Sequence, residues 1–219
     1  MKIVVENASK EIRGSVILKN VNLDLCSGTI YGLQGPNGSG KTMLIRLIAG
    51  LIQPSSGKVY IDGKQLGKAI DFPDSMGVLI ENPAFLPGYT GADNLELLAG
   101  IQMKIGTQEI RQALRTVGLD PDDKRKFRKY SLGMKQRLGI AAAIMENPML
   151  ILLDEPFNAL DEQGVAQIRQ VIMEQRNRGA LIVIACHDAH ILESMADEIF
   201  CISDGILQKK SNEARMKNE

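Results

Sequence analysis

The beginning of the chain alternates hydrophobic and polar positions, as half-buried strands do. The clearest case is Val21, Leu23 and Leu25. Strands are predicted at residues 3–5, 16–18, 21–25, 29–33, 58–61 and 76–80. Asp62-Gly63 is a hairpin turn signal, so the segment after the strand at 58–61 should turn back antiparallel. We therefore expect a β-rich subdomain at the beginning of the chain.

Residues 91–118 change to the spacing of three and four that is typical of an amphipathic helix. The positions that share one helical face are Leu95, Leu98 and Ile101. Thr107 is predicted to cap a helix, with Glu109 in its first turn, where the helix dipole favours an anion. Another helix, rich in Ala and Leu, is predicted after Ser131.

The end of the chain alternates strands and helices. Two continuous apolar runs, 149–153 and 180–185, are typical of parallel strands that are buried on both faces. An amphipathic helix is predicted between them at 162–177, and a last strand at 199–202. This order predicts an α/β protein with a mostly parallel sheet and a helical insertion.

Composition narrows the class of protein further. Of the 219 residues, 44% are hydrophobic and 24% are charged, which argues against disorder. Lys plus Arg and Asp plus Glu both number 26, so the net charge is zero, whereas a dedicated nucleic-acid-binding protein is usually basic. No apolar run approaches the ~18 residues of a membrane helix, and the N-terminus lacks a signal-peptide core. We expect a chain that neither spans a membrane nor is exported by that route.

The three cysteines, Cys26, Cys186 and Cys201, lie far apart in the sequence. A disulfide framework or a zinc site would be expected to use paired cysteines. We interpret these residues as small hydrophobic core residues in a reducing cytosol.

The strongest motif is a glycine-rich segment between a predicted strand and a predicted helix. It fits G-x-x-x-x-G-K-[ST] at every fixed position. Its residues are Gly35, Pro36, Asn37, Gly38, Ser39, Gly40, Lys41 and Thr42. Glycines let backbone N–H groups approach phosphate oxygens, and the helix N-terminus adds partial positive charge. We expect Lys41 to reach the β- and γ-phosphates of a nucleotide and Thr42 to ligate Mg²⁺; a glycine-rich turn with an incidental lysine is the alternative.

Acidic residues and a histidine follow the two predicted buried strands. Asp154 stands at the carboxyl end of the strand at 149–153, where ligands bind in α/β sheets, and we expect it to hold Mg²⁺. Glu155 is placed to orient or deprotonate a water molecule. His187 follows the strand at 180–185 and is expected to donate a hydrogen bond to a γ-phosphate, whereas His190 is interpreted as helix surface.

Together the motifs resemble the nucleotide-binding subunit of ABC (ATP-binding cassette) transporters, over nearly all of residues 1–208. The segment 130–137, Tyr-Ser-Leu-Gly-Met-Lys-Gln-Arg, stands where the family has its LSGGQ signature. Residues 158–161, Asn-Ala-Leu-Asp, match the loop after the catalytic glutamate, and 180–187 match the strand and switch histidine. The resemblance implies ATP and Mg²⁺ as ligands.

The resemblance also implies the domain organisation. We expect an α/β fold: a P-loop NTPase core with a mostly parallel sheet, an antiparallel β subdomain and an inserted helical subdomain. The whole of 1–219 would form a single ABC ATPase domain. The core and the β subdomain would comprise 1–84 and 149–219, with the helical insertion at about 85–148. The charged tail 211–219 is too short to form a regulatory domain.

In this family two subunits bind head to tail around two ATP molecules, here as a homodimer or a pseudo-dimer. The signature residues that face the partner's ATP would be Ser131, Leu132, Gly133 and Met134, and the dimer loop would be Asn158, Ala159, Leu160 and Asp161. Ser131 is also a good helix cap. Glu155 would act as the base, while Lys41 and His187 stabilise charge. The helical insertion would contact membrane-spanning permease subunits, which places the chain in the cytoplasm, peripheral at the cytoplasmic face of the cell membrane.

Three departures from the family pattern affect these expectations. Leu132 and Met134 replace Gly and Gln of the signature. Ile12 and Arg13 stand where the family often has an aromatic residue, so adenine is expected to rest on aliphatic carbons or the guanidinium. Glu81 replaces a Gln near the metal, and we expect it to contact Mg²⁺ and to sense the γ-phosphate. The combination of Glu81 and this signature resembles the pattern of the bacitracin-resistance and lantibiotic-immunity exporter subgroup.

The favoured function is an ATPase that powers export of a peptide, antibiotic or other amphipathic compound. One alternative is a soluble ABC ATPase that acts on nucleic acid or ribosomes, although the chain lacks a second cassette and basic extensions, so no nucleic-acid partner is expected. Another is a nucleotide-responsive module that hydrolyses ATP poorly. The basic run at 124–129 is interpreted as a solvated loop, with contact to a partner subunit or anionic lipid as the alternative.

Overall fold

The structure is a computed structural model that describes residues 1–210. Its larger sheet has six strands in the order β10-β9-β3-β8-β7-β6. They are β3 (Ile30–Gln34), β6 (Met76–Leu79), β7 (Leu150–Asp154), β8 (Leu181–Cys186), β9 (Glu198–Ser203) and β10 (Ile206–Lys209). All neighbours are parallel except β10, which pairs antiparallel at one edge. The mostly parallel sheet predicted for the core is confirmed.

The second sheet is antiparallel and has the order β2-β1-β4-β5. Its strands are β1 (Lys2–Ile12), β2 (Ser15–Cys26), β4 (Ser56–Ile61) and β5 (Lys64–Gln65). The predicted hairpin at Asp62-Gly63 is confirmed, because β4 turns back there into β5. The strands predicted at 16–18 and 21–25 form one strand, β2, in which Asn20 bends the backbone into the left-handed region at φ 47°.

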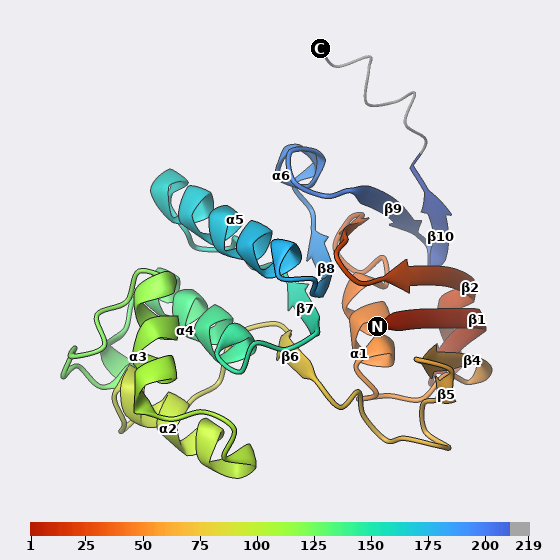
Figure 1. Cartoon of the computed structure of the whole chain (residues 1–219). Helices are drawn as coiled ribbons and strands as arrows, with labels where there is room; N and C mark the ends of the chain where they lie inside the picture. Colours follow the sequence, from red (N-terminus) through yellow and green to blue (C-terminus); the bar gives the residue numbers. More distant parts are fainter. Residues whose placement is uncertain (211–219) are drawn as a thin grey trace.

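In Figure 1 the larger sheet lies between α1 (Lys41–Ile48) with the antiparallel sheet on one side and α5 (Glu162–Asn177) with the helical insertion on the other. An apolar layer fills the space on each side. On one face, helix α1 and the antiparallel sheet pack against Leu152 and Val183. On the other face, α5, α6 (Ala189–Glu193) and the helical insertion pack against Leu153 and Ile184. Alternate residues of β7 and β8 therefore enter different layers, which explains why both strands are continuously apolar.

The helical insertion comprises α2 (Gly91–Gln102), α3 (Thr107–Thr116), a 3₁₀ turn (Phe127–Lys129) and α4 (Leu132–Ile144). Its apolar residues share one core with the sheet, which joins it firmly to the rest of the chain. Arg137 strengthens this junction, since its guanidinium donates to Val117 O at 2.6 Å and to Gln167 Oε1 of α5 at 2.7 Å.

Two predictions about local structure are wrong. Thr107 is the first helical residue of α3 rather than its cap, because Gly106 occupies the cap position. The backbone N–H of Gly106 donates to the Glu109 carboxylate at 3.0 Å. Of the three cysteines, only Cys186 is a buried core residue, whereas Cys26 is exposed and Cys201 is half-buried. Within the described residues, no helix is both long and apolar enough to cross a membrane. The charged tail 211–219 lies outside the described residues.

Candidate nucleotide-binding site

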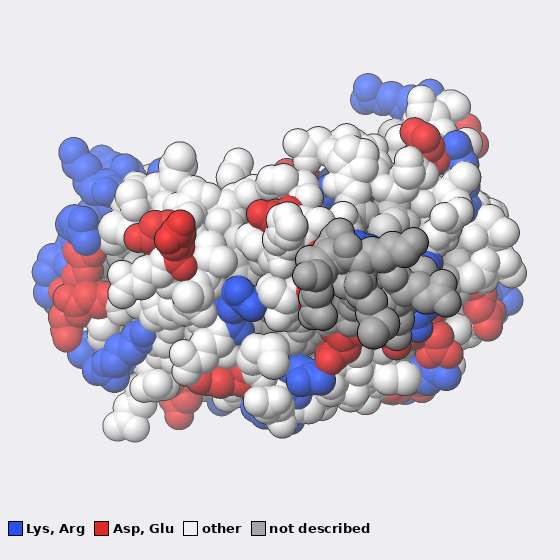
Figure 2. Space-filling view, turned by 90° about the horizontal axis from the view of Figure 1, so that it is seen from above, with Lys and Arg blue, Asp and Glu red and all other residues white. Residues whose placement is uncertain are grey.

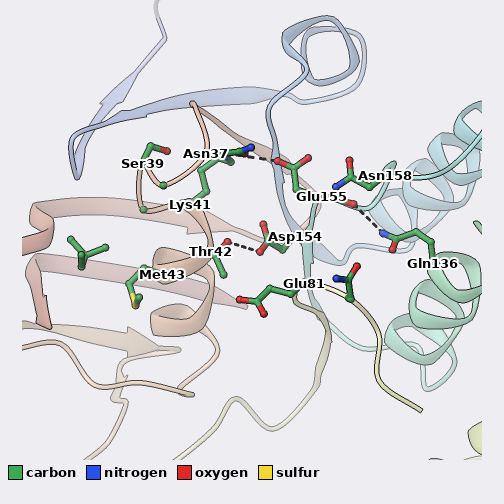
Figure 3. A pocket seen from close by; sticks show the side chains of 14 residues that line it. Asn37, Ser39, Lys41, Thr42, Met43, Glu81, Gln136, Asp154, Glu155 and Asn158 are labelled. Atoms are coloured by element: carbon green, nitrogen blue, oxygen red, sulfur yellow. Dashed lines mark hydrogen bonds and ion pairs between the residues drawn. The ribbon is translucent and has the colours of Figure 1, made fainter. Parts of the chain in front are cut away.

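The glycine-rich segment lines a pocket of about 420 Å³ at the carboxyl ends of β3 and β7 (Figure 3). The lining residues are Ile17, Asn37, Gly38, Ser39, Gly40, Lys41, Thr42, Met43, Glu81, Asn82, Gln136, Asp154, Glu155 and Asn158. The pocket therefore brings together the P-loop, the residues that follow β7 and the loop that leads into the helical insertion.

Lys41 is buried at the start of α1 and points back over its own loop. Its ammonium group donates to Gly35 O at 2.7 Å and to Pro36 O at 3.1 Å. A glycine is required at position 35, because a Cβ atom there would lie 2.3 Å from Ile202 O. The loop thus holds a desolvated cation over a ring of backbone groups, the arrangement that binds phosphate.

Thr42 and Asp154 meet on the floor of the pocket. Thr42 Oγ1 donates to Asp154 Oδ2 at 2.6 Å. Burial raises the pKa of Asp154, and the bond from Thr42 opposes this shift. Asp154 Oδ1 is buried and has no hydrogen-bond partner among residues 1–210. A hydroxyl beside a carboxylate oxygen without a partner is a suitable donor set for Mg²⁺, which prefers oxygen ligands.

Glu155 follows Asp154 with a left-handed backbone at φ 51°. This turn directs its carboxylate to His187, whose Nδ1 lies 2.8 Å from Glu155 Oε2. Glu155 Oε1 lies 3.9 Å from Lys41 Nζ. Gln136 donates to the backbone carbonyl of Glu155 at 3.0 Å and so ties the turn to α4. A carboxylate that is fixed by a histidine at the pocket wall can accept a proton from water.

The signature residues Ser131, Leu132, Gly133 and Met134 begin α4, away from the pocket of their own chain. The prediction that Ser131 caps this helix is confirmed, since its hydroxyl accepts from Met134 N at 3.2 Å. A Cβ atom on Gly133 would lie 2.8 Å from Ala159 O, so the signature packs closely on the loop 158–161. Leu132 is 71% exposed.

The loop 158–161 connects the pocket to α5. Asn158 lines the pocket, and Ala159 adopts a left-handed φ of 62°. Leu160 packs on the core, and Asp161 caps α5 by accepting from Gly164 N at 2.9 Å.

The positions of Ile12, Arg13 and Glu81 bear on the expected contacts with adenine and with metal. Ile12 is the last residue of β1, and Arg13 lies in the turn to β2; neither is among the described residues that line the pocket, whereas Ile17 of β2 is. Glu81 lines the pocket but is 61% exposed and forms an ion pair of 2.6 Å with Arg46 of α1. Their contacts with adenine and with metal stay predictions.

The sequence of the chain matches the ABC transporter family over residues 18–158. The chain belongs to the ABC transporter family. It is 44% identical to an uncharacterized ABC transporter ATP-binding protein, YybJ, of Bacillus subtilis, with 94% of each chain covered. It is 37% identical to the bacitracin transport ATP-binding protein BcrA of Enterococcus faecalis (96% of this chain, 69% of the relative). It is 35% identical to the lantibiotic transport ATP-binding protein SrtF of Streptococcus pyogenes (94% and 90%).

Among solved structures, the chain is similar to the ATP-binding cassette MJ0796 in a dimeric post-hydrolysis state bound to ADP and Pi. The TM-score is 0.84 at 26% identity, with 94% of this chain and 98% of that chain covered. The chain is therefore an ABC ATPase cassette, and the expected fold and family are confirmed. The similarity to bacitracin and lantibiotic transport proteins agrees with the predicted subgroup.

Proposed function

We propose that the chain is the ATP-hydrolysing subunit of a transporter that exports a peptide, an antibiotic or another amphipathic compound through separate membrane subunits. The observation that carries this proposal is the 2.8 Å contact between Glu155 and His187, set beside the P-loop lysine. It provides an oriented base where an attacking water would stand. The printed names of the bacitracin and lantibiotic relatives support the class of cargo.

Phosphate binding would use the P-loop. The carbonyls of Gly35 and Pro36 now accept from Lys41, and the more strongly charged β- and γ-phosphate oxygens would replace them. Ser39 Oγ, buried and without a hydrogen-bond partner among residues 1–210, would donate to phosphate. Thr42 and Asp154 would hold Mg²⁺, which when bound neutralises charge on the phosphate oxygens.

Hydrolysis would use the residues that directly follow β7 and β8. Glu155 would take the proton of the attacking water, and the 2.8 Å bond to His187 would keep its carboxylate in position. The His187 side chain is 58% exposed, so its other ring nitrogen remains accessible to a γ-phosphate. Lys41, 3.9 Å from Glu155, would stabilise the negative charge that develops in the transition state.

Dimerisation would complete the site. Ser131 and Leu132 are exposed at the N-terminus of α4, where the helix dipole and free N–H groups favour an anion. Since these residues lie away from the pocket of their own chain, they would face the ATP of a second subunit, in a homodimer or a pseudo-dimer. The dimeric form of the similar cassette supports this arrangement.

The membrane subunits would bind the helical insertion. Leu95 of α2 is buried, but Leu98 and Ile101, predicted to share its face, are 38% and 74% exposed. Other exposed apolar side chains on or next to this helix are Leu86, Tyr89, Leu97 and Met103. A patch of this kind is typical of a protein interface. It would place the chain in the cytoplasm, at the cytoplasmic face of the membrane.

The basic run 124–129 supports a lipid contact less well than the apolar patch supports a protein contact. Figure 2 shows Lys and Arg interspersed with Asp and Glu at the end of the molecule formed by the insertion. Arg125 pairs with Asp123 at 2.7 Å, and Lys126 lies 3.8 Å from Asp93. These pairs favour the interpretation of the run 124–129 as a solvated loop.

The test is to purify the chain from membranes of its native host under mild detergent and to measure its ATPase rate alone and with the proteins that copurify. The proposal expects a hydrophobic partner that spans the membrane and changes the rate. Copurification with ribosomes or nucleic acid instead would favour the soluble ABC ATPase and refute the transport function.

A further inference from the structure

A cysteine, a histidine and a carboxylate meet at the wall of the hydrolytic site. One ligand atom each from Glu155, Cys186 and His187 lies within 4.8 Å of the other two. Within residues 1–210, this is the one group of three or more His, Cys, Asp and Glu side chains that comes this close. The phosphate-binding mechanism does not use Cys186.

The sheet register builds this group. β7 and β8 are parallel neighbours that pair Asp154 with Ala185, so the residues that follow them stand side by side. Glu155 N donates to Ala185 O at 2.8 Å, which fixes the separation of the two strand ends. Backbone pairing therefore brings the carboxylate, the thiol and the imidazole within 4.8 Å of one another.

We propose that Glu155, Cys186 and His187 form a binding site for a thiophilic divalent cation such as Zn²⁺, whose occupation blocks ATP hydrolysis. Sulfur and imidazole ligands select zinc and similar ions over Mg²⁺, whose oxygen donors Thr42 and Asp154 lie apart from this group. Three protein ligands with a fourth position open to water are a known coordination of zinc, typical of its catalytic sites.

The geometry requires small shifts in both directions: the 2.8 Å contact between Glu155 and His187 must widen, and the thiol, within 4.8 Å of both, must approach them. Zinc bonds of about 2.0–2.3 Å place tetrahedral ligand atoms about 3.4–3.8 Å apart. Because the His187 side chain is 58% exposed, its ring can rotate toward the buried thiol. The cation replaces the hydrogen bond between Glu155 and His187, and the proton of that bond moves to the other nitrogen of the imidazole ring. It also displaces the thiol proton to solvent and forms a bond to Cys186 Sγ. Glu155 is then no longer available to deprotonate water.

The burial of Cys186 argues against chemical modification as its role. The residue is 2% exposed, and burial raises the pKa of its thiol to about 11. A neutral, inaccessible thiol is a poor nucleophile toward oxidants and alkylating agents.

The experiment measures binding of Zn²⁺ and Co²⁺ to the nucleotide-free chain. We expect one equivalent of Zn²⁺ in competition with a chromogenic chelator, and a sulfur-to-cobalt charge-transfer band with Co²⁺. Cys186→Ser should remove the band and weaken Zn²⁺ binding at least ~10-fold, the least expected from loss of a ligand. Cys26→Ser and Cys201→Ser serve as matched controls and should bind as the wild type does. His187→Gln, at an exposed position, should also weaken binding and keeps the test decisive if Cys186→Ser misfolds.

A second readout connects the site to turnover. With Mg·ATP in large excess, Zn²⁺ should inhibit the wild-type ATPase and leave nucleotide affinity unchanged, while Cys186→Ser should retain its rate. The proposal is overturned if Zn²⁺ does not bind, if Cys186→Ser and His187→Gln bind it as the wild type does, or if a control cysteine carries the charge-transfer band. The binding arm uses no ATP, so it stands or fails separately from the proposed transport function.

Discussion

Substitution of Glu81 tests whether the proposed metal site is coupled to the helical insertion. Its carboxylate pairs with Arg46 of α1 at 2.6 Å, and Figure 3 shows it projecting from the loop after β6. The Glu81 side chain is 61% exposed and that of Arg46 35%, so the pair is worth about 0.2–1 kcal/mol. A difference of ~1.4 kcal/mol corresponds to tenfold in affinity. Even if the whole energy of the pair entered into ATP binding, Glu81→Gln would therefore change the ATP affinity of the isolated subunit less than about fivefold.

The coupling to the membrane subunit should suffer more than ATP affinity. Glu81 lies on the path from β6 to α2, and its charge would be attracted by Mg²⁺ and repelled by the γ-phosphate of a bound nucleotide. The assay is nucleotide affinity of the subunit alone, followed by ATPase rate and export with the membrane partner. Arg46→Gln is the matched control, because it breaks the same ion pair but keeps the Glu81 carboxylate.

Any of three results would refute a sensing role for the Glu81 carboxylate. Loss of ATP binding in the isolated Glu81→Gln subunit would make Glu81 a required metal ligand rather than a sensor. Wild-type export by this variant would show that the carboxylate has no role in coupling. If Arg46→Gln impairs export to the same degree, the ion pair itself, and not the charge near the metal, carries the effect.

Three further predictions address the site and its support. Lys41→Ala should abolish ATP binding without unfolding the chain, because it removes the cation held 2.7 Å from Gly35 O; unchanged affinity in the folded variant would refute this. Gly133→Ala should destabilise the fold by about 1–3 kcal/mol in chemical unfolding, because the new methyl group meets Ala159 O. The control Gly100→Ala, with no atom within 4 Å, should stabilise α2 by about 0.5–1 kcal/mol. Removing Mg²⁺ with EDTA should stop hydrolysis, and adding Mg²⁺ back should restore it. Turnover without metal would exclude Asp154 and Thr42 as ligands of a required Mg²⁺.

Much of the fold follows from local pattern. The strands β7 and β8 are buried on both faces, so their apolar runs are continuous, and α5 is buried on one face, so its helical period is clear. The predicted bounds of all three elements lie within one residue of the structure. The cap of α3 was missed because Gly106 has no side chain to signal a cap, while Thr107 beside it does.

The site was predictable where it is contiguous in sequence and not where it depends on packing. The P-loop residues lie together because the motif itself encodes a turn before a helix. Ile17 lines the pocket, but the hydrophobic pattern of its strand predicts only that the strand belongs to the β subdomain. Nothing in the local sequence indicates that this side chain reaches the pocket. The pair of Arg46 and Glu81 joins residues 35 apart, and the approach of Cys186 to Glu155 depends on strand register. Such contacts arise from tertiary structure rather than from local sequence.

The most direct test of the catalytic assignment is the Glu155→Gln variant. An amide keeps the shape of the side chain but cannot accept the proton of water, so ATP binding should persist while turnover falls by at least ~10²-fold. The measurement is single-turnover hydrolysis together with size-exclusion chromatography in the presence and absence of Mg·ATP. The account predicts an ATP-bound dimer that does not hydrolyse its nucleotide. Hydrolysis by the variant at the wild-type rate would contradict it.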